Sequence, residues 1–382
     1  MREDERVTPL ELFFDLVFVL ALTQCTTLVA RTPTWGGALK GLLVLGMLWW
    51  SWVGYAWLTS VVDPEEGAVR LTIFAAIAAF LVAALCVPGA FGSEALLFAC
   101  AYAVVRGAHI FLFMLASRDD PALRQSVLGL AASTAVGAGL LFAAAAASGA
   151  LRIGLWGLAL VLDAGGPFLF GQDGWKLVPG HFAERHGAIV IIALGESIVA
   201  LGVGAKASIG VGVVVAAVLG TVVAAALWWI YFDVTAIIAR RRLAKAAEGR
   251  ERNGIARDSY SYLHFPMIAG IALLAVGLKL TLEHVDRPLA LVPAASLLGG
   301  TALYLLAHVA FRLRNMRTLS VRRLLSAIVL LALLPATRTI SGLATLAITA
   351  ALLTALVLYE AIRYSEWRDR VRHELAREPI TD

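Results

Sequence analysis

Charged residues are scarce in this chain. Asp, Glu, Lys and Arg make up 15% of its 382 residues, whereas an average soluble domain has about 25%. Cysteine is also rare, and the three residues Cys25, Cys86 and Cys100 lie in apolar runs without the spacing of a metal site or a disulfide framework. We therefore expect three buried thiols, and the low charge argues against an ordinary soluble domain.

The sequence also lacks the motifs of several enzyme classes. It contains no nucleophile motif, no phosphate-binding loop and no Asp-Asp-x-x-Asp pattern. Asp119 and Asp120 stand beside Arg118 between two apolar runs, which is typical of a solvated turn. No long polar segment is present that could act as a signalling domain. These absences leave an enzyme or a sensor with little support.

What the chain has in abundance is apolar sequence. Hydrophobic residues make up 60% of it, and the mean hydropathy is +0.82. Apolar runs long enough to cross a bilayer recur from end to end, which predicts an all-α, polytopic integral membrane protein. The first run contains Glu11 and Asp15 and is too long for a signal peptide, so we expect no cleavable leader. About twelve spans are expected, near residues 9–30, 37–60, 69–90, 94–116, 123–148, 151–171, 181–203, 208–238, 260–283, 289–311, 321–336 and 340–362.

The distribution of basic residues predicts the orientation of these spans. The N-terminus, the even-numbered connections and the C-terminus carry 24 of the 32 Lys and Arg, and the odd-numbered connections carry six. Cytoplasmic loops are enriched in Lys and Arg, so both termini should be cytoplasmic and the chain should lie in the cell inner (plasma) membrane. The basic loop at 240–257 suits anionic headgroups. Membrane lipids are the expected partners, and nucleic acid is not.

Three short matches indicate an internal repeat. Residues 21–24 resemble 193–196, residues 48–50 resemble 227–229, and residues 108–109 resemble 307–308. Each match joins span n to span n+6, and an even shift preserves orientation. We therefore expect two parallel six-helix halves, at 1–171 and 172–363, followed by a cytoplasmic tail at 364–382.

Two stretches resemble the bacterial low temperature requirement protein A (LtrA) family. The first is residues 7–19, VTPLELFFDLVFV, and the second is HFAER at 181–185 followed by ALGESIV at 193–199. The fragment HFP at 264–266 is similar to a later histidine-bearing helix of that family. The resemblance implies an integral membrane protein but no particular activity, substrate or cofactor. His186 stands where an apolar or aromatic residue is expected, so we weight it below His181.

Acids and bases inside the first four spans are candidates for a site. Glu11 and Asp15 are spaced i, i+4 and share one helix face. They could bind a proton or cation, or they could pair with Arg6 and helix-end donors. Arg106 and His109 share a face of the fourth span, and Arg106 needs a carboxylate partner in the bilayer. The candidate partners are Glu11, Asp15, Asp163 and Glu184.

The sixth and seventh spans supply the remaining candidates. Asp163 is followed by a Gly-Gly-Pro sequence that should interrupt its helix. At the start of the seventh span, helical spacing lets Glu184 and Arg185 reach His181. His181, Glu184, His264 and His308 map to the cytoplasmic half of the spans. His181 and Glu184 could supply two ligands to a metal, or the group could form a hydrogen-bonded network. Glu196 follows His181 by 15 residues, which places it about 22 Å further along the helix at about 1.5 Å per residue. There it could be protonated or could bind a cation.

Three function classes remain open at this point. The first is a proton- or cation-coupled transporter or permease of a small molecule or ion, with a polar pocket open to the cytoplasm. The second is a membrane-embedded enzyme that acts on a lipid-like substrate through Asp, Glu and His, with or without a metal. The third is a sensor or scaffold. Ten substrate- or ion-binding candidates are carried forward: Glu11, Asp15, Arg106, His109, Asp163, His181, Glu184, Arg185, Glu196 and His264.

Overall fold

The computed structural model describes residues 7–171, 174–205 and 210–366. These residues form helices and no β-strand; an isolated bridge joins Pro288 to Ser341. The chain divides into two compact units. The first unit comprises 1–192 and 243–265, and the second comprises 193–242 and 266–382. The expected six-helix halves and their internal repeat stay predictions, because a division by contacts does not test a repeat.

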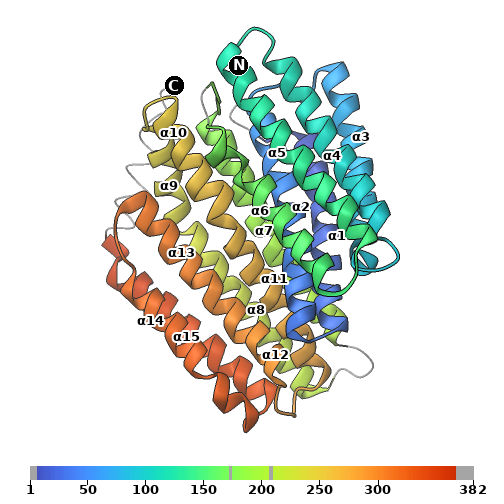
Figure 1. Cartoon of the computed structure of the whole chain (residues 1–382). Helices are drawn as coiled ribbons and strands as arrows, with labels where there is room; N and C mark the ends of the chain where they lie inside the picture. The colour runs from blue at the N-terminus through green and yellow to red at the C-terminus, as the bar shows by residue number, and fades with distance from the viewer. Residues whose placement is uncertain (1–6, 172–173, 206–209, 367–382) are drawn as a thin grey trace. The chain divides into compact units, whose positions relative to one another are not determined.

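The first unit contains the first six long helices and the start of the seventh (Figure 1). Short helices follow each other around residue 260, before α11 begins. The elements are α1 (Pro9–Arg31), α2 (Trp35–Leu58), α3 (Gly67–Cys86), η1 (Val87–Gly89), α4 (Ala95–Ala116), α5 (Pro121–Ala146), α6 (Gly149–Leu169), the start of α7 (Pro179–Gly204), α10 (Arg250–Ile255) and η2 (Ala256–Tyr262).

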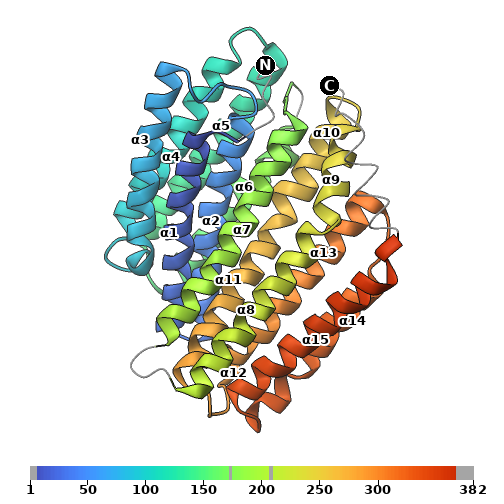
Figure 2. The same cartoon turned by 180° about the vertical axis from the view of Figure 1, so that it is seen from behind.

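The second unit contains the end of α7 and the later helices (Figure 2). Its elements are α8 (Val211–Phe232), α9 (Thr235–Ala244), α11 (His264–Glu283), α12 (Leu291–Ala294), η3 (Ala295–Gly299), α13 (Gly300–Met316), α14 (Val321–Ala332), η4 (Leu334–Arg338) and α15 (Gly342–Arg363). The expected span at 208–238 corresponds to the apolar helical stretch from Val211 to Ala244, within which α8 ends at Phe232 and α9 begins at Thr235.

Helix α1 shows how local sequence sets a helix start. Thr8 is the N-cap residue, and its side chain accepts a hydrogen bond from the backbone N–H of Glu11. The Glu11 carboxylate in turn accepts from the backbone N–H of Thr8 at 2.8 Å. This reciprocal pair is a capping box, and Pro9 at the first helical position fixes the entry into the helix. The cap also holds the Glu11 side chain at the beginning of the helix.

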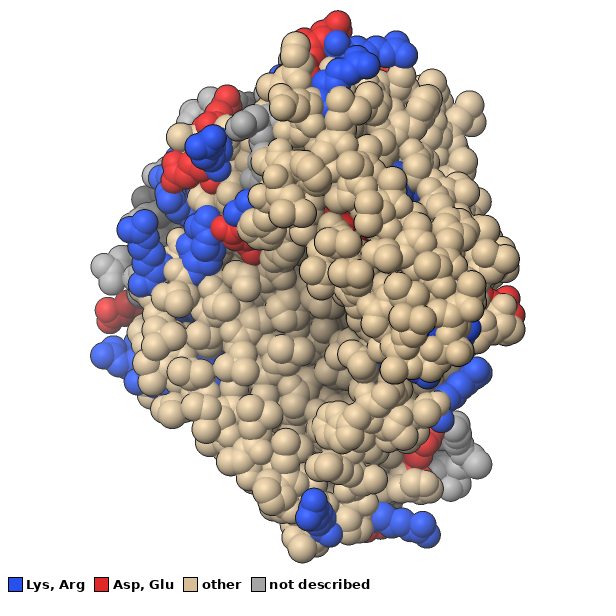
Figure 3. All heavy atoms as spheres, in the orientation of Figure 1, with Lys and Arg blue, Asp and Glu red and all other residues tan. Residues whose placement is uncertain are grey.

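Helix α2 is the centre of the first unit. It contacts α1, α4 and α6, and its residues from Val44 to Leu58 are all buried. The helices around it present apolar side chains on their outer faces, among them Leu71 and Phe74 on α3 and Phe111 on α4. On the face drawn in Figure 3 the sides of the helices are almost free of charge, and Lys and Arg gather toward the edges of the view. This pattern is that of a lipid-facing surface.

Eleven helices among the described residues are long and apolar enough to cross a membrane. The expected span at 321–336 falls below that length, because α14 ends at Ala332 and Pro335 follows in a 3-10 helix. The segment begins after the end of α13, and it ends where Ser341 bridges Pro288, next to the start of α12. A twelfth crossing at this segment stays a prediction.

Two further expectations need correction. Cys25 and Cys86 are buried as expected, but Cys100 is exposed on α4. The Gly-Gly-Pro sequence does not break α6, which continues to Leu169 with Pro167 in its last turn. Pro167 cannot donate a backbone hydrogen bond to the carbonyl of Asp163, and α6 ends two residues later. The first unit instead contains a π-helix, η2, and such segments are frequent at functional sites.

Candidate functional site

Four ionisable side chains meet between the first two turns of α1 and of α7. We call this group of Glu11, Asp15, His181 and Arg185 the α1–α7 cluster. Each of the four is at most 2% exposed. The i, i+4 spacing of each pair, with Glu11 and Asp15 on α1 and His181 and Arg185 on α7, turns them toward each other. All four belong to the first unit.

The contacts within the cluster are short. The Nε2 atom of His181 lies 2.8 Å from Oε1 of Glu11 and 3.1 Å from its Oε2. The Nη2 atom of Arg185 donates to Oδ1 of Asp15 at 2.7 Å, and its Nη1 lies 3.6 Å from Oε1 of Glu11. Arg185 thus lies against both acids, and the carboxylate of Glu11 faces nitrogen atoms of both Arg185 and His181.

Polar residues of α2 complete the surroundings of the cluster. The indole N–H of Trp52 donates to Oδ1 of Asp15 at 2.7 Å. Arg185 donates to the Thr59 hydroxyl at 3.1 Å, and its guanidinium lies 5.3 Å from the centre of the Trp52 ring. The other oxygen of Asp15, Oδ2, is buried without a hydrogen-bond partner among the described residues. It is the oxygen of this carboxylate that can take a proton or face a cation.

The simpler hypothesis for Glu11 and Asp15 is correct in part. Glu11 does use helix-end donors, since both the backbone N–H and the hydroxyl of Thr8 donate to its Oε2, at 2.8 and 2.9 Å. Arg6, the other expected partner, lies outside the described residues. Both acids are nonetheless buried and paired with α7, which the sequence alone left open.

Glu184 is not part of this group. Its side chain is exposed, whereas those of His181 and Arg185 on either side are buried. The expectation that Glu184 reaches His181 is therefore wrong, because α1 packs against the side of α7 that carries His181 and Arg185. Among the described residues, no group of three or more His, Cys, Asp or Glu side chains could hold a metal ion. A metal site built on His181 and Glu184 has no support.

A cluster of aromatic residues adjoins α7 and η2. His186 is fully buried, and its ring centre lies 5.0 Å from Trp52, 5.2 Å from His264 and 5.2 Å from Tyr260. The Nδ1 of His264 is 2.9 Å from the carbonyl of Ser259, within η2. His186 thus lies among aromatic rings, at a position where an apolar or aromatic residue was expected. Its contact with His264 shows that His264 lies next to α7.

The second buried group joins α4, α5 and α6. The Nη2 atom of Arg106 donates to Oδ1 of Asp163 at 2.8 Å and to the Thr134 hydroxyl at 2.7 Å. The Thr134 hydroxyl donates to the same carboxylate oxygen at 2.8 Å, and the Tyr102 hydroxyl donates to Oδ2. The prediction that Arg106 pairs with one of four named acids is confirmed, with Asp163 as the partner. Sequence reasoning missed Tyr102 and Thr134, whose neutral side chains carry no signal of a buried charge.

A glycine allows α2 to approach this pair closely. A Cβ atom at Gly54 would lie 2.9 Å from Nη1 of Arg106 and 2.9 Å from Nε2 of His109. His109 itself is buried, and its Nδ1 lies 3.4 Å from Nη1 of Arg106. The expected adjacency of Arg106 and His109 on α4 is therefore present, and both residues line a cavity.

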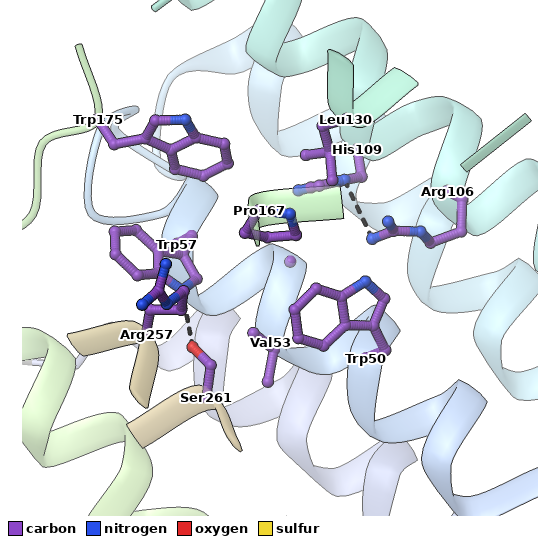
Figure 4. Close-up of a pocket in the computed structure, with 11 residues that line it drawn as sticks. Trp50, Val53, Trp57, Arg106, His109, Leu130, Pro167, Trp175, Arg257 and Ser261 are labelled. Atoms are coloured by element: carbon purple, nitrogen blue, oxygen red, sulfur yellow. Dashed lines mark hydrogen bonds between the residues drawn. The ribbon is translucent and has the colours of Figure 1, made fainter. Parts of the chain in front are cut away.

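The cavity lies between α2, α4 and η2 (Figure 4). Trp50, Trp57 and Trp175 surround it, with Arg106 and His109 to one side. The indole N–H of Trp57 donates to the Ser261 hydroxyl at 2.9 Å. The indole nitrogens of Trp50 and Trp175 have no hydrogen-bond partner among the described residues. The cavity volume is about 30 Å³, enough for water and too small for a larger solute.

The tenth candidate, Glu196, belongs to the second unit. It lies on α7 beyond the unit boundary, is 2% exposed, and follows a helical stretch without ionisable residues from Gly187 to Gly195. The burial fits the expectation of an acid held away from water.

The family model of the bacterial low temperature requirement A protein (LtrA) matches residues 6–358. The chain belongs to the LtrA family. It is similar to the uncharacterized protein RA0937 of Rhizobium meliloti (strain 1021), with 30% identity over 306 residues that cover 77% of this chain and 74% of that protein. No solved structure shows a significant match to the chain.

The two stretches that carry the LtrA resemblance supply the α1–α7 cluster. Glu11 and Asp15 lie in the first stretch, and His181 and Arg185 lie at the start of the second. In this LtrA-family chain the two stretches, which are far apart in the sequence, are thus held together by charge and hydrogen bonds.

Proposed function

We propose that this LtrA-family membrane protein is a transporter of a small molecule or ion, coupled to protons or cations. The observation that carries the proposal is the charge imbalance of the α1–α7 cluster. Counted over these four residues alone, and with a neutral His181, the two carboxylates of Glu11 and Asp15 exceed the single guanidinium of Arg185 by one negative charge. One proton or one monovalent cation removes that excess.

A buried net charge is costly in a membrane protein, so the cluster favours taking up a positive charge. Two places are available for a proton. One is His181, whose Nε2 faces Glu11 at 2.8 Å, and the other is Oδ2 of Asp15, which has no hydrogen-bond partner among the described residues. A group that gains and loses one charge inside the bilayer is what coupled transport requires.

The Arg106–Asp163 pair supports this assignment by contrast. One guanidinium balances one carboxylate, and hydroxyl groups of Tyr102 and Thr134 satisfy both carboxylate oxygens. A charge-balanced pair whose carboxylate oxygens are both hydrogen-bonded has little reason to exchange a proton, so we assign it to holding α4, α5 and α6 together.

The surroundings of the cluster favour a transport route on the side where α1 and α7 begin. By the asymmetry of basic residues this side faces the cytoplasm, and the membrane is the inner membrane.

The cavity beside Arg106 is small, so passage of a solute requires it to widen. The π-helix η2, whose Ser261 accepts hydrogen bonds from Trp49 and Trp57, is an irregular segment that could rearrange.

The enzyme hypothesis has weaker support. Both acids of the cluster are engaged by Arg185, Trp52 and His181, and the described residues offer no metal-binding group. Neither Glu11 nor Asp15 lines the cavity beside Arg106. We therefore favour transport.

The test is the charge movement that follows a pH jump. Purified protein in liposomes is adsorbed to a solid-supported membrane, and the external pH is stepped from about 8 to about 6, the range in which histidine titrates. The wild type should give a transient current as the cluster takes up a proton. Glu11→Gln keeps the shape of the side chain and removes the excess charge, so its current should fall to the protein-free background.

The matched control is Glu184→Gln, which neutralises an exposed acid on α7, next to Arg185 but outside the cluster. Its current should equal that of the wild type. Both variants are checked by size-exclusion chromatography, so a folding defect is recognised as such. A wild type without protein-dependent current, or a Glu11→Gln variant with an undiminished one, contradicts the proposal.

A further inference from the structure

A second cavity lies in the second unit, where α8, α13 and α15 end and α14 begins. Its volume is about 470 Å³. The charged residues that line it are Arg312, Arg322, Arg323, Asp233 and Glu360, three cations and two acids. The transport proposal makes no use of this cavity, which lies wholly within the second unit.

One of the three arginines is already neutralised. Arg323 donates from Nε and Nη2 to the two carboxylate oxygens of Glu360, at 2.9 and 2.6 Å. Its Nη1 lies 2.7 Å from Nδ1 of His308. This bidentate pair is part of the wall of the cavity and leaves little charge for a ligand.

The other two arginines keep their charge available. The Nε of Arg312 is buried and has no hydrogen-bond partner among the described residues. Arg322 contacts the Tyr364 hydroxyl at 3.3 Å and stacks 4.1 Å over the ring of Tyr359, both of which are neutral partners. Against these two guanidinium groups stands the single carboxylate of Asp233, so the cavity has an excess positive charge.

The start of α14 adds further donors. The helix begins at Val321 and is 12 residues long, and its N-cap residue Ser320 forms no side-chain cap hydrogen bond. The backbone N–H groups of a first helical turn lack intrahelical acceptors and attract anions, phosphate in particular. Ser320, Val321 and Arg322 all line the cavity.

The remainder of the wall is apolar and aromatic. Its apolar and aromatic lining includes Ile230, Val234, Ile238, Leu319, Trp229 and Tyr364. Trp and Tyr favour the level of the lipid headgroups, and the end of a span is where a headgroup lies. A free phosphate ion would use the arginines and would leave this apolar wall in contact with water.

We propose that this cavity binds the phosphate of an anionic glycerophospholipid. Arg312, Arg322 and the N-terminus of α14 receive the phosphate, and the acyl chains follow the apolar wall into the bilayer. Basic pockets between the ends of transmembrane helices are suited to such headgroups. The lipid would thereby join α8, α13, α14 and α15 at one end of the second unit.

The experiment is native mass spectrometry of the full chain, purified in detergent and titrated with phosphatidylglycerol or phosphatidylcholine. The wild type should retain phosphatidylglycerol in preference to phosphatidylcholine. Each of Arg312→Gln and Arg322→Gln should weaken phosphatidylglycerol binding about fivefold, the usual contribution of one basic residue near an anionic surface. Phosphatidylcholine binding should not change in either variant.

The control is Arg314→Gln, which removes a basic residue from the same helix end but outside the cavity; it should bind phosphatidylglycerol like the wild type. Equal losses in Arg314→Gln and Arg312→Gln would indicate general surface attraction and overturn the site. Displacement of the lipid by millimolar inorganic phosphate would indicate a free-anion site and overturn the lipid assignment. If Arg312→Gln does not fold, the test rests on Arg322→Gln, which changes an exposed side chain. Unchanged phosphatidylglycerol binding in that variant contradicts the proposal.

Discussion

The carboxylate of Glu11 lies 2.8 Å from the imidazole of His181, although 170 residues separate them in the sequence. Glu11 is in the first turn of α1, and His181 is in the first turn of α7. The two helices therefore begin at the same end of the first unit. Because both helices begin at the same end, the chain must run from one end of the first unit to the other an even number of times before α7 begins. The six helices α1 to α6 account for this even number.

The Arg106–Asp163 pair should be a major contributor to the stability of the first unit. Asp163→Asn keeps the size of the side chain and leaves the buried Arg106 without a counter-charge. Loss of one partner of a buried ion pair costs about 3–5 kcal/mol. We expect a large fall in the apparent melting temperature, measured in detergent by tryptophan fluorescence.

Two variants check the reason for that fall. The double substitution Arg106→Met with Asp163→Leu removes both charges and should recover much of the lost stability. Asp120→Asn changes a partly exposed acid at the start of α5 and should shift the melting temperature little. A melting temperature for Asp163→Asn equal to that of the wild type would show that the pair is dispensable.

Gly54 should be intolerant of a side chain. Alanine there would place a methyl group 2.9 Å from Nη1 of Arg106 and from Nε2 of His109. Overpacking of this kind costs about 1–3 kcal/mol, and the displaced guanidinium would also lose alignment with Asp163. Gly107→Ala, one residue after Arg106, meets nothing within 4 Å and should be neutral or stabilising. Equal melting temperatures for the two variants would refute the close approach.

The sequence predicted the class of fold and most of the buried ionisable residues. Apolar runs mark membrane spans, and an acid or arginine within such a run must be buried against a partner. This reasoning found Arg106 and Asp163. It could not choose Asp163 among four acids, because the choice depends on which face of α6 is turned toward α4.

Helical spacing was also insufficient to separate Glu184 from Arg185. Both residues are within reach of His181 along one helix, and only the packing of α1 against α7 decides that Arg185 is buried and Glu184 exposed. Trp52 was missed for a related reason. It stands in a run of tryptophans that looks like core sequence, and its hydrogen bond to Asp15 becomes visible only in three dimensions.

The orientation in the membrane can be tested by cysteine labelling of intact cells. The 240–257 loop is expected to be cytoplasmic from its basic residues. Glu248 is exposed and suits a reporter, whereas Ala246 in the same loop is buried. In a cysteine-free background, Glu248→Cys should react with an impermeant maleimide only after permeabilisation.

The opposite side needs its own reporter. Ser148 is exposed in the connection between α5 and α6 and forms no side-chain cap hydrogen bond. Ser148→Cys should react in intact cells. Labelling of Glu248→Cys from outside, with Ser148→Cys protected, would reverse the orientation and move the beginnings of α1 and α7 to the external side.

A substitution at Glu196 can test whether binding of a proton and its transfer are separate steps. It lies 15 residues beyond His181 on the same helix, a rise of about 22 Å at about 1.5 Å per residue, and it is 2% exposed. If the α1–α7 cluster binds the proton and Glu196 serves a later step, Glu196→Gln should keep the pH-jump current of the wild type. It should lose solute-driven proton movement, measured with a pH-sensitive dye inside proteoliposomes for whichever solute moves protons in the wild type. Glu11→Gln should lose both signals, because it removes the first step. Full solute-driven proton movement in Glu196→Gln would assign this acid to holding helices together, since glutamine keeps its shape and most of its hydrogen bonds.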